Sequence, residues 1–119
     1  MKVIDFETGV NMNMSSLQGY VKTTYDKLVE IFGEPTYTDA DPYEKVNCEW
    51  TVEAAVKKIG DEYALIKDFE MDEDYIDYVK FSIYNWKDGF IPTEEYDWHI
   101  GGYGFDAVDA ATEIINDAT

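Results

Sequence analysis

Hydrophobic and polar residues alternate in two stretches of the chain. Every second residue between Lys45 and Ala54 is apolar or cysteine, and those between are polar. The apolar set comprises Val46, Cys48, Trp50 and Val52. Because successive side chains of a strand point to opposite faces, this pattern predicts a half-buried strand. Tyr78–Trp86 also alternates but has apolar side chains on both faces, which predicts a central strand.

Two other stretches carry apolar residues at the three- and four-residue spacing of a helix. The first is Thr24–Phe32, where Thr23 or Thr24 offers an N-cap, and Gly33 and Pro35 mark the end. The second is Phe105–Asn116. Its expected inner stripe comprises Phe105, Val108, Ala111 and Ile115.

The remaining segments predict short strands joined by short links. Lys2–Phe6, Tyr63–Ile66 and Tyr96–Ile100 favour strands, and Leu17–Lys22 is compatible with an extended chain. Short links between strands favour hairpins, and hairpins make antiparallel sheets. The sequence therefore predicts one α+β domain over residues 1–119, with an antiparallel sheet of about four strands packed with two helices.

The charge balance says less about fold than about partners. The chain has 26 Asp and Glu but nine Lys and Arg, a formal net charge of −17. Such a surface repels nucleic acid and anionic membranes and attracts basic surfaces. Aromatic residues make up 16% of the chain, far more than an acidic disordered tail contains, so we expect the charge on a folded surface. The expected partner is a basic nucleic-acid-binding protein, not nucleic acid or a membrane.

Acidic residues gather in two clusters, which are the predicted partner-binding residues. The denser run comprises Asp68, Glu70, Asp72, Glu73, Asp74 and Asp77. The predicted C-terminal helix carries Asp106, Asp109, Glu113 and Asp117. On one helix face these four recur about every 5–6 Å, near the spacing of successive phosphates on a nucleic-acid strand. No Lys or Arg follows Lys87 to balance them, although an ordinary solvated face is the alternative.

Candidate catalytic chemistry is sparse. The single cysteine, Cys48, lies in the apolar set of a predicted strand, so we expect a structural thiol and no internal disulfide. The single histidine, His99, is a candidate general base beside Asp97 or Asp106, but a lone histidine near a core more often has a structural role. One histidine and one cysteine make no transition-metal site. We therefore predict neither an enzyme nor a cofactor nor a metal site.

Several motifs occur together in order along the chain: FGEP at 32–35, EW at 49–50, IYNWKDG at 83–89 and WHIGG at 98–102. They resemble a family of small, uncharacterised proteins encoded by bacteriophages and prophages. The resemblance implies a phage origin and the cytoplasm of an infected bacterium, but no established activity. In that family a short turn joins the Glu-Trp strand to the Ile-Tyr-Asn strand, whereas this chain has an acidic insertion around residues 56–77.

Charge and resemblance together predict a phage-encoded inhibitor that mimics nucleic acid and binds a host restriction or CRISPR protein. One alternative is a small-molecule or nucleotide-binding protein with an aromatic pocket, built from Tyr84, Trp86, Trp98 and Tyr103. Another is a phage housekeeping protein without catalytic activity. The sequence leaves a homodimer open. No stretch approaches the ~20 apolar residues of a membrane span, so we expect a soluble, cytoplasmic protein.

Overall fold

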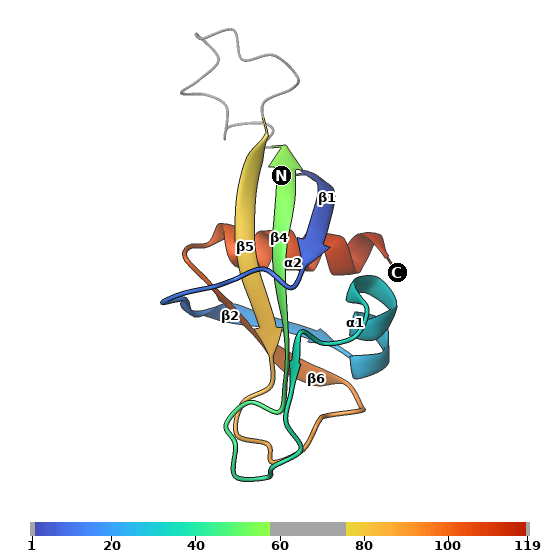
Figure 1. The fold of residues 1–119 in the computed structure, drawn as a ribbon. Coiled ribbons are helices and arrows are strands. Elements are labelled where there is room, and N and C mark those ends of the chain that lie inside the picture. The colour runs from blue at the N-terminus through green and yellow to red at the C-terminus, as the bar shows by residue number, and fades with distance from the viewer. Residues whose placement is uncertain (1, 58–75, 119) are drawn as a thin grey trace, which may run out of the picture.

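The computed structural model describes residues 2–57 and 76–118, in which an antiparallel sheet packs with two helices (Figure 1). The elements in chain order are β1 (Lys2–Thr8), β2 (Ser16–Thr23), α1 (Tyr25–Phe32), β3 (Tyr37–Thr38), β4 (Cys48–Lys57), β5 (Asp77–Tyr84), β6 (Tyr96–Gly102) and α2 (Asp106–Asp117). The strand order is β1-β4-β5-β6-β2, and β3 pairs with the beginning of β4. The predicted α+β fold is confirmed, but the sheet has six strands rather than about four.

Helix α1 begins and ends where local signals in the sequence predict. Thr24 is the N-cap, and its Oγ1 accepts a hydrogen bond from the Lys27 N–H at 3.2 Å. The Gly33 N–H donates to the Val29 carbonyl at 2.8 Å and closes the helix. Leu28 and Phe32 are the buried residues of its inner face.

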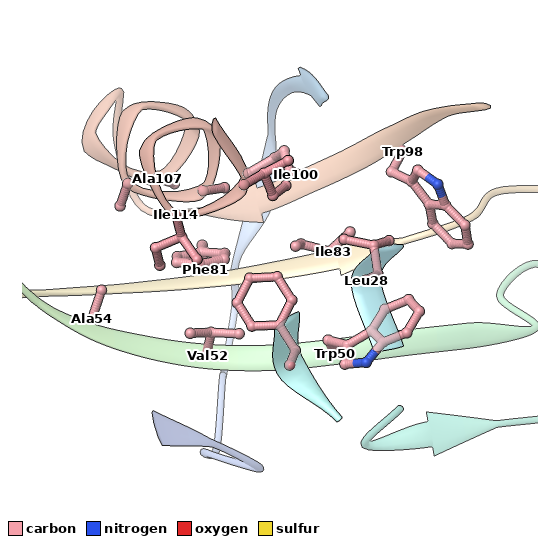
Figure 2. Packing of buried hydrophobic residues seen from close by; sticks show 14 of the residues in the cluster. Leu28, Trp50, Val52, Ala54, Phe81, Ile83, Trp98, Ile100, Ala107 and Ile114 are labelled. Atoms are coloured by element: carbon pink, nitrogen blue, oxygen red, sulfur yellow. The ribbon is translucent and has the colours of Figure 1, made fainter. Parts of the chain in front are cut away.

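The hydrophobic core lies between the helices and one face of the sheet (Figure 2). Trp50 and Trp98 are fully buried, and their rings meet edge to face with centroids 5.6 Å apart. Figure 2 shows bulky side chains at one end of the core and alanines at the other: Leu28, Trp50 and Trp98, against Ala54 and Ala107. Large residues thus fill the space near α1, while small residues allow α2 to lie close to the sheet.

The buried face of α2 agrees with the predicted stripe at Ala111 and Ile115 but not at Phe105. The helix starts at Asp106, and Phe105 is 88% exposed rather than buried. The buried residues are Ala107, Ala110, Ala111, Ile114 and Ile115. Phe105 is the N-cap and precedes the first turn of α2, and Ala107 is the residue that lies beside Gly102 of β6.

Replacing Gly102 with alanine is expected to lower the free energy of unfolding by about 1–3 kcal/mol. A Cβ at this position would lie 2.5 Å from the Ala107 Cβ, so α2 would have to move away from the sheet. Urea unfolding followed by circular dichroism measures the change. Gly104→Ala is the control, since nothing lies within 4 Å of its Cβ position. Equal stability of Gly102→Ala and the wild type would contradict close packing here.

The connection from β1 to β2 crosses the sheet face that the helices leave uncovered. The two strands lie at opposite edges of the sheet, and Figure 1 shows residues 9–15 passing in front of β4 and β5, with α2 behind. The Lys80 Nζ donates to the Asn11 carbonyl at 3.3 Å, and the Asn13 N–H donates to the Tyr103 hydroxyl at 3.0 Å. This crossover helps to explain why Thr51 and Ser82 are buried.

Candidate functional site

The four predicted acidic residues of α2 lie on one flank of the helix but differ in exposure. Asp109 and Asp117 are exposed, whereas Asp106 and Glu113 are partly buried. Glu113 Oε1 accepts a hydrogen bond from the Val3 N–H of β1 at 3.3 Å. Glu113 therefore helps to hold the edge strand on the helix, and Asp109 and Asp117 are the members of the row that a partner can reach.

Most of the second predicted cluster lies outside the described residues. This holds for Asp68, Glu70, Asp72, Glu73 and Asp74, and for the strand predicted at Tyr63–Ile66. Asp77 is described: it begins β5, opposite Val56 of β4. The predicted insertion around residues 56–77 includes residues of the sheet at both ends, since Val56 and Lys57 belong to β4.

A groove of about 400 Å³ lies where β1, α1 and the end of α2 meet. Three carboxylates line it, those of Asp5, Glu30 and Asp117, and the other lining residues are apolar: Val3, Ile4, Phe6, Ile31, Ile114 and Ala118. Lys27 lies nearby, with its Nζ 3.9 Å from Glu30 Oε2 and 3.0 Å from the Ala118 carbonyl oxygen. We call this the acidic groove. Its apolar floor and acidic lining suit a long basic side chain, whose stem is apolar and whose tip is charged.

Acidic side chains continue from the acidic groove around the β1 edge. Glu7 of β1 lies directly opposite Glu53 of β4 in the sheet. A second hollow, of about 270 Å³, is lined by Asp5, Glu7 and Glu53. Like charges directly opposite each other on two strands destabilise a sheet, although Lys80 of β5 lies on the other side of Glu53. The β1 edge therefore presents three carboxylates, with one lysine beside them.

A row of polar and aromatic side chains lies on the sheet face away from the helices. Backbone pairing places Glu49 opposite Tyr84, Tyr84 opposite His99, and His99 opposite Tyr20. The His99 ring centroid lies 4.9 Å from that of Tyr20 and 5.4 Å from that of Tyr84. Both neighbours of His99 along β6 are fully buried in the core, so strand alternation directs His99 to the opposite face. Four strands thus bring together one residue each.

A pocket of about 400 Å³ opens over this row and is lined by Leu17, Tyr20, Tyr84, Trp86 and His99. We call it the aromatic pocket. The Trp86 ring lies edge to face with Tyr84 at 6.2 Å, and Trp86 is 40% exposed. Gly101 makes room for the Tyr84 ring, since a Cβ there would lie 3.3 Å from Tyr84 Cε1. The His99 Nδ1 atom is buried and has no hydrogen-bond partner among the described residues.

Two lysines lie beside the aromatic pocket. The Nζ atoms of Lys45 and Lys87 lie 5.8 Å and 5.9 Å from the centroid of the Trp86 ring. The Lys87 N–H also donates to the Lys45 carbonyl at 2.7 Å, which joins the two segments that carry these lysines. These two cations lie beside a pocket whose residues also feel nearby carboxylates, since the charge of Glu49 acts on Tyr84 and that of Asp88 acts on His99.

The buried side chain of Asn85 holds this rim in place. Its Oδ1 accepts hydrogen bonds from the N–H groups of Asn47 and Cys48 at 2.9 Å and 3.0 Å. Its Nδ2 donates to the Phe90 carbonyl at 3.0 Å and to Asp88 Oδ2 at 3.1 Å. Asn85 therefore ties the start of β4, which follows Lys45, to the turn that carries Trp86 and Lys87.

Burial disfavours the charged forms of three residues in this row, namely Glu49, Tyr84 and His99. It lowers the pKa of His99, an effect that the nearby Asp88 charge partly opposes. It raises the pKa of Tyr84, and the negative charge of Glu49 raises that pKa further. Burial also raises the pKa of Glu49. His99 is therefore a neutral imidazole at pH 7, and Tyr84 keeps its proton.

The structure places Cys48 in the core, as predicted. The residue is fully buried, and burial raises the pKa of its thiol to about 12. A thiol that keeps its proton at neutral pH is a poor nucleophile. Cys48 therefore acts in packing at the beginning of β4.

Two of the four aromatic residues predicted to form a ligand pocket lie elsewhere. Trp98 is fully buried and donates from its Nε1 to the Thr23 carbonyl at 3.1 Å. The Tyr103 hydroxyl donates to the Asn13 carbonyl at 2.8 Å, in the crossover. From the sequence, Leu17, Tyr20 and Lys45 are not predicted to belong to this pocket, and His99 is a candidate base or a structural residue. Tyr20 and His99 come together through the pairing register of β2 with β6, which local sequence patterns do not reveal.

Residues 2–57 and 76–118 contain neither a metal-binding cluster nor a membrane-spanning helix. No three or more His, Cys, Asp or Glu side chains are arranged there to hold a metal ion. No helix in the same ranges combines the length and the apolar composition of a membrane-spanning segment.

Comparison with protein-family models gives no match for the chain. Searches of curated proteins and of solved structures likewise return no significant match.

Proposed function

We propose that the protein is a phage-encoded inhibitor that occupies the nucleic-acid groove of a basic host defence protein, of the restriction or CRISPR type. The net charge of −17 is the observation that carries the proposal. Nine Lys and Arg cannot neutralise 26 carboxylates, so most of the acidic groups remain available to a basic surface. The protein acts by binding, without a catalytic step, in the cytoplasm of the infected bacterium.

The acidic groove supports this proposal with a local geometry. Asp5, Glu30 and Asp117 line a hollow whose remaining walls are apolar. A lysine or arginine of the partner would bury its aliphatic stem there and bring its charge to the carboxylates. Asp109 is exposed on the same helix and extends the acidic surface toward the N-terminus of α2. The residues Asp68 to Asp77 form the second part of the proposed contact surface.

Affinity from such a surface has a characteristic salt dependence. A basic groove that binds nucleic acid holds anions when empty, and an acidic protein that replaces the nucleic acid releases them. Salt also screens exposed charges beyond about 10 Å at 0.1 M ionic strength. Binding is therefore expected to weaken steeply as salt rises.

The test is a pull-down from bacterial lysate at low salt, with elution by rising salt. We expect a DNA- or RNA-processing protein to be retained, to elute at moderate salt and to be displaced by duplex DNA. Mass spectrometry identifies it, and titration of the purified partner measures the affinity. If no basic nucleic-acid-binding protein is retained at low salt, the proposal is wrong.

Charge reversal locates the contact on the chain. Asp109→Lys with Asp117→Lys is expected to weaken binding of the identified partner at least about tenfold, because both side chains are exposed on the acidic flank of α2. Glu94→Lys with Glu95→Lys changes the net charge equally, at exposed positions between β5 and β6, and is the matched control. A second variant reverses Asp68, Glu70, Asp72, Glu73 and Asp74. Undiminished inhibition by both acidic variants would rule out mimicry.

A further inference from the structure

We infer that the aromatic pocket binds a mononucleotide: its base lies against Tyr84 and Trp86 beside His99, and its phosphate meets Lys45 and Lys87. This binding is separate from the proposed inhibition, since none of these residues lines the acidic groove.

Size and lining suit a small planar ligand. The volume of about 400 Å³ lies within the range of small-molecule sites, which are mostly apolar with a few polar groups. Four of the five lining residues carry aromatic rings, namely Tyr20, Tyr84, Trp86 and His99. Nucleobases stack on such rings whatever their sequence identity, because every base has a π-face.

An unused hydrogen-bonding group accompanies the rings. His99 lines the pocket, and its buried Nδ1 has no partner among the described residues. An unsatisfied buried polar atom is costly, and proteins rarely keep one without a use. A nitrogen heterocycle offers both donors and acceptors at its edge, so a small tilt of the imidazole would allow a hydrogen bond to the bound base.

The two lysines at the rim suit an anionic ligand of limited size. Lys45 and Lys87 both lie within 6 Å of the Trp86 ring, at the rim. Each offers an ammonium group to the phosphate of a ligand stacked on that ring. The net charge of −17 repels a longer polyanion, so a mononucleotide is favoured over an oligonucleotide.

Calorimetric titration of the full chain with each of the ribonucleoside 5′-monophosphates tests the inference. Trp86 is 40% exposed while Trp50 and Trp98 are fully buried, so quenching of tryptophan fluorescence reports a ligand stacked on Trp86. We expect at least one nucleotide to bind and quench at millimolar concentration, its nucleoside to bind about tenfold more weakly, and inorganic phosphate alone not to bind. No heat and no quenching with any nucleotide would overturn the inference. So would equal affinity for nucleoside and nucleotide, or tighter binding of an oligonucleotide.

Substitutions in the aromatic pocket and at its rim test which residues contact the base and which contact the phosphate. Trp86→Leu is expected to lower nucleotide affinity about tenfold, against Phe105→Leu as a control at another exposed aromatic residue. Lys45→Gln with Lys87→Asn is expected to reduce nucleotide affinity to that of the nucleoside, with Lys2→Gln as control. Asparagine suits position 87, where φ is 58°.

His99→Phe keeps a ring but removes both nitrogens, and is expected to weaken nucleoside and nucleotide binding alike. Unchanged affinity in the Trp86 variant and in the lysine variant would overturn the assignment to this pocket.

Discussion

Replacing Asn85 with alanine is expected to lower the free energy of unfolding by about 3–5 kcal/mol. The substitution leaves the N–H groups of Asn47 and Cys48 without their acceptor in the protein interior. It also removes the donor that satisfies the Phe90 carbonyl. A buried group that loses its partner costs its full desolvation, and here several groups lose theirs at once. Urea unfolding followed by far-UV circular dichroism measures the change.

The control for Asn85 is Asn13→Ala, because the Asn13 side chain is exposed. We expect its stability to stay within about 0.5 kcal/mol of the wild type. Asn85→Asp is informative as well, since it keeps an acceptor for the two N–H groups but places a second carboxylate 3.1 Å from the position of Asp88. If Asn85→Ala is as stable as Asn13→Ala, the network does not hold the two loops together.

Replacing Trp50 with alanine is expected to cost about 3–5 kcal/mol of the free energy of unfolding. Trp50 is fully buried between Tyr25 and Trp98, with ring centroids 5.7 Å and 5.6 Å away. Its Nε1 donates to the Gly33 carbonyl at 2.9 Å, which ties the end of α1 to β4. The substitution therefore opens a cavity in the core and releases one end of the helix.

Trp50→Phe separates these two effects and guards against a variant that does not fold. It fills part of the cavity but lacks the Nε1 donor, so we expect a loss smaller than that of Trp50→Ala. Trp86→Ala is the control at an exposed tryptophan, where we expect a smaller loss than at Trp50. If the alanine variants at positions 50 and 86 lose equal stability in urea, Trp50 is not a central core residue.

Elements with strong local signals are predictable from this sequence. The Thr24 cap and Gly33 bound α1 within a few residues, and the alternation around Trp50 defines β4. The short edge strands are harder to predict: β1 and β2 each pair with a strand far away in the sequence, and the two-residue β3 forms by pairing with β4. The predicted strand at Lys2–Phe6 lies in β1, and the extended chain at Leu17–Lys22 lies in β2, but the periodicity of these segments is weak and that of β3 is absent. About four strands were therefore predicted, whereas the described residues form a sheet of six.

The acidic row of α2 and the aromatic pocket also differ in how far the sequence reveals them. The acidic row of α2 is visible in the sequence because its members recur at helical spacing, yet its exposure is not: Glu113 turns to the Val3 N–H of β1. The aromatic pocket is hardly visible at all. Tyr20 and His99 are 79 positions apart and meet only because β2 pairs with β6 in one register. The contact of Lys45 with the Trp86 ring likewise joins two segments that are distant in the sequence, as the Asn85 network does.

The sequence by itself determined the charge, the α+β class, the helix α1 and the alternation of the central strands. Each of these depends on composition or on residues that lie close together in the sequence. Only the tertiary structure decided the strand order, the inner face of α2 and the residues of the two surfaces. Those depend on strand register and on how closely a helix can approach glycine and alanine, and both are set by packing between distant segments.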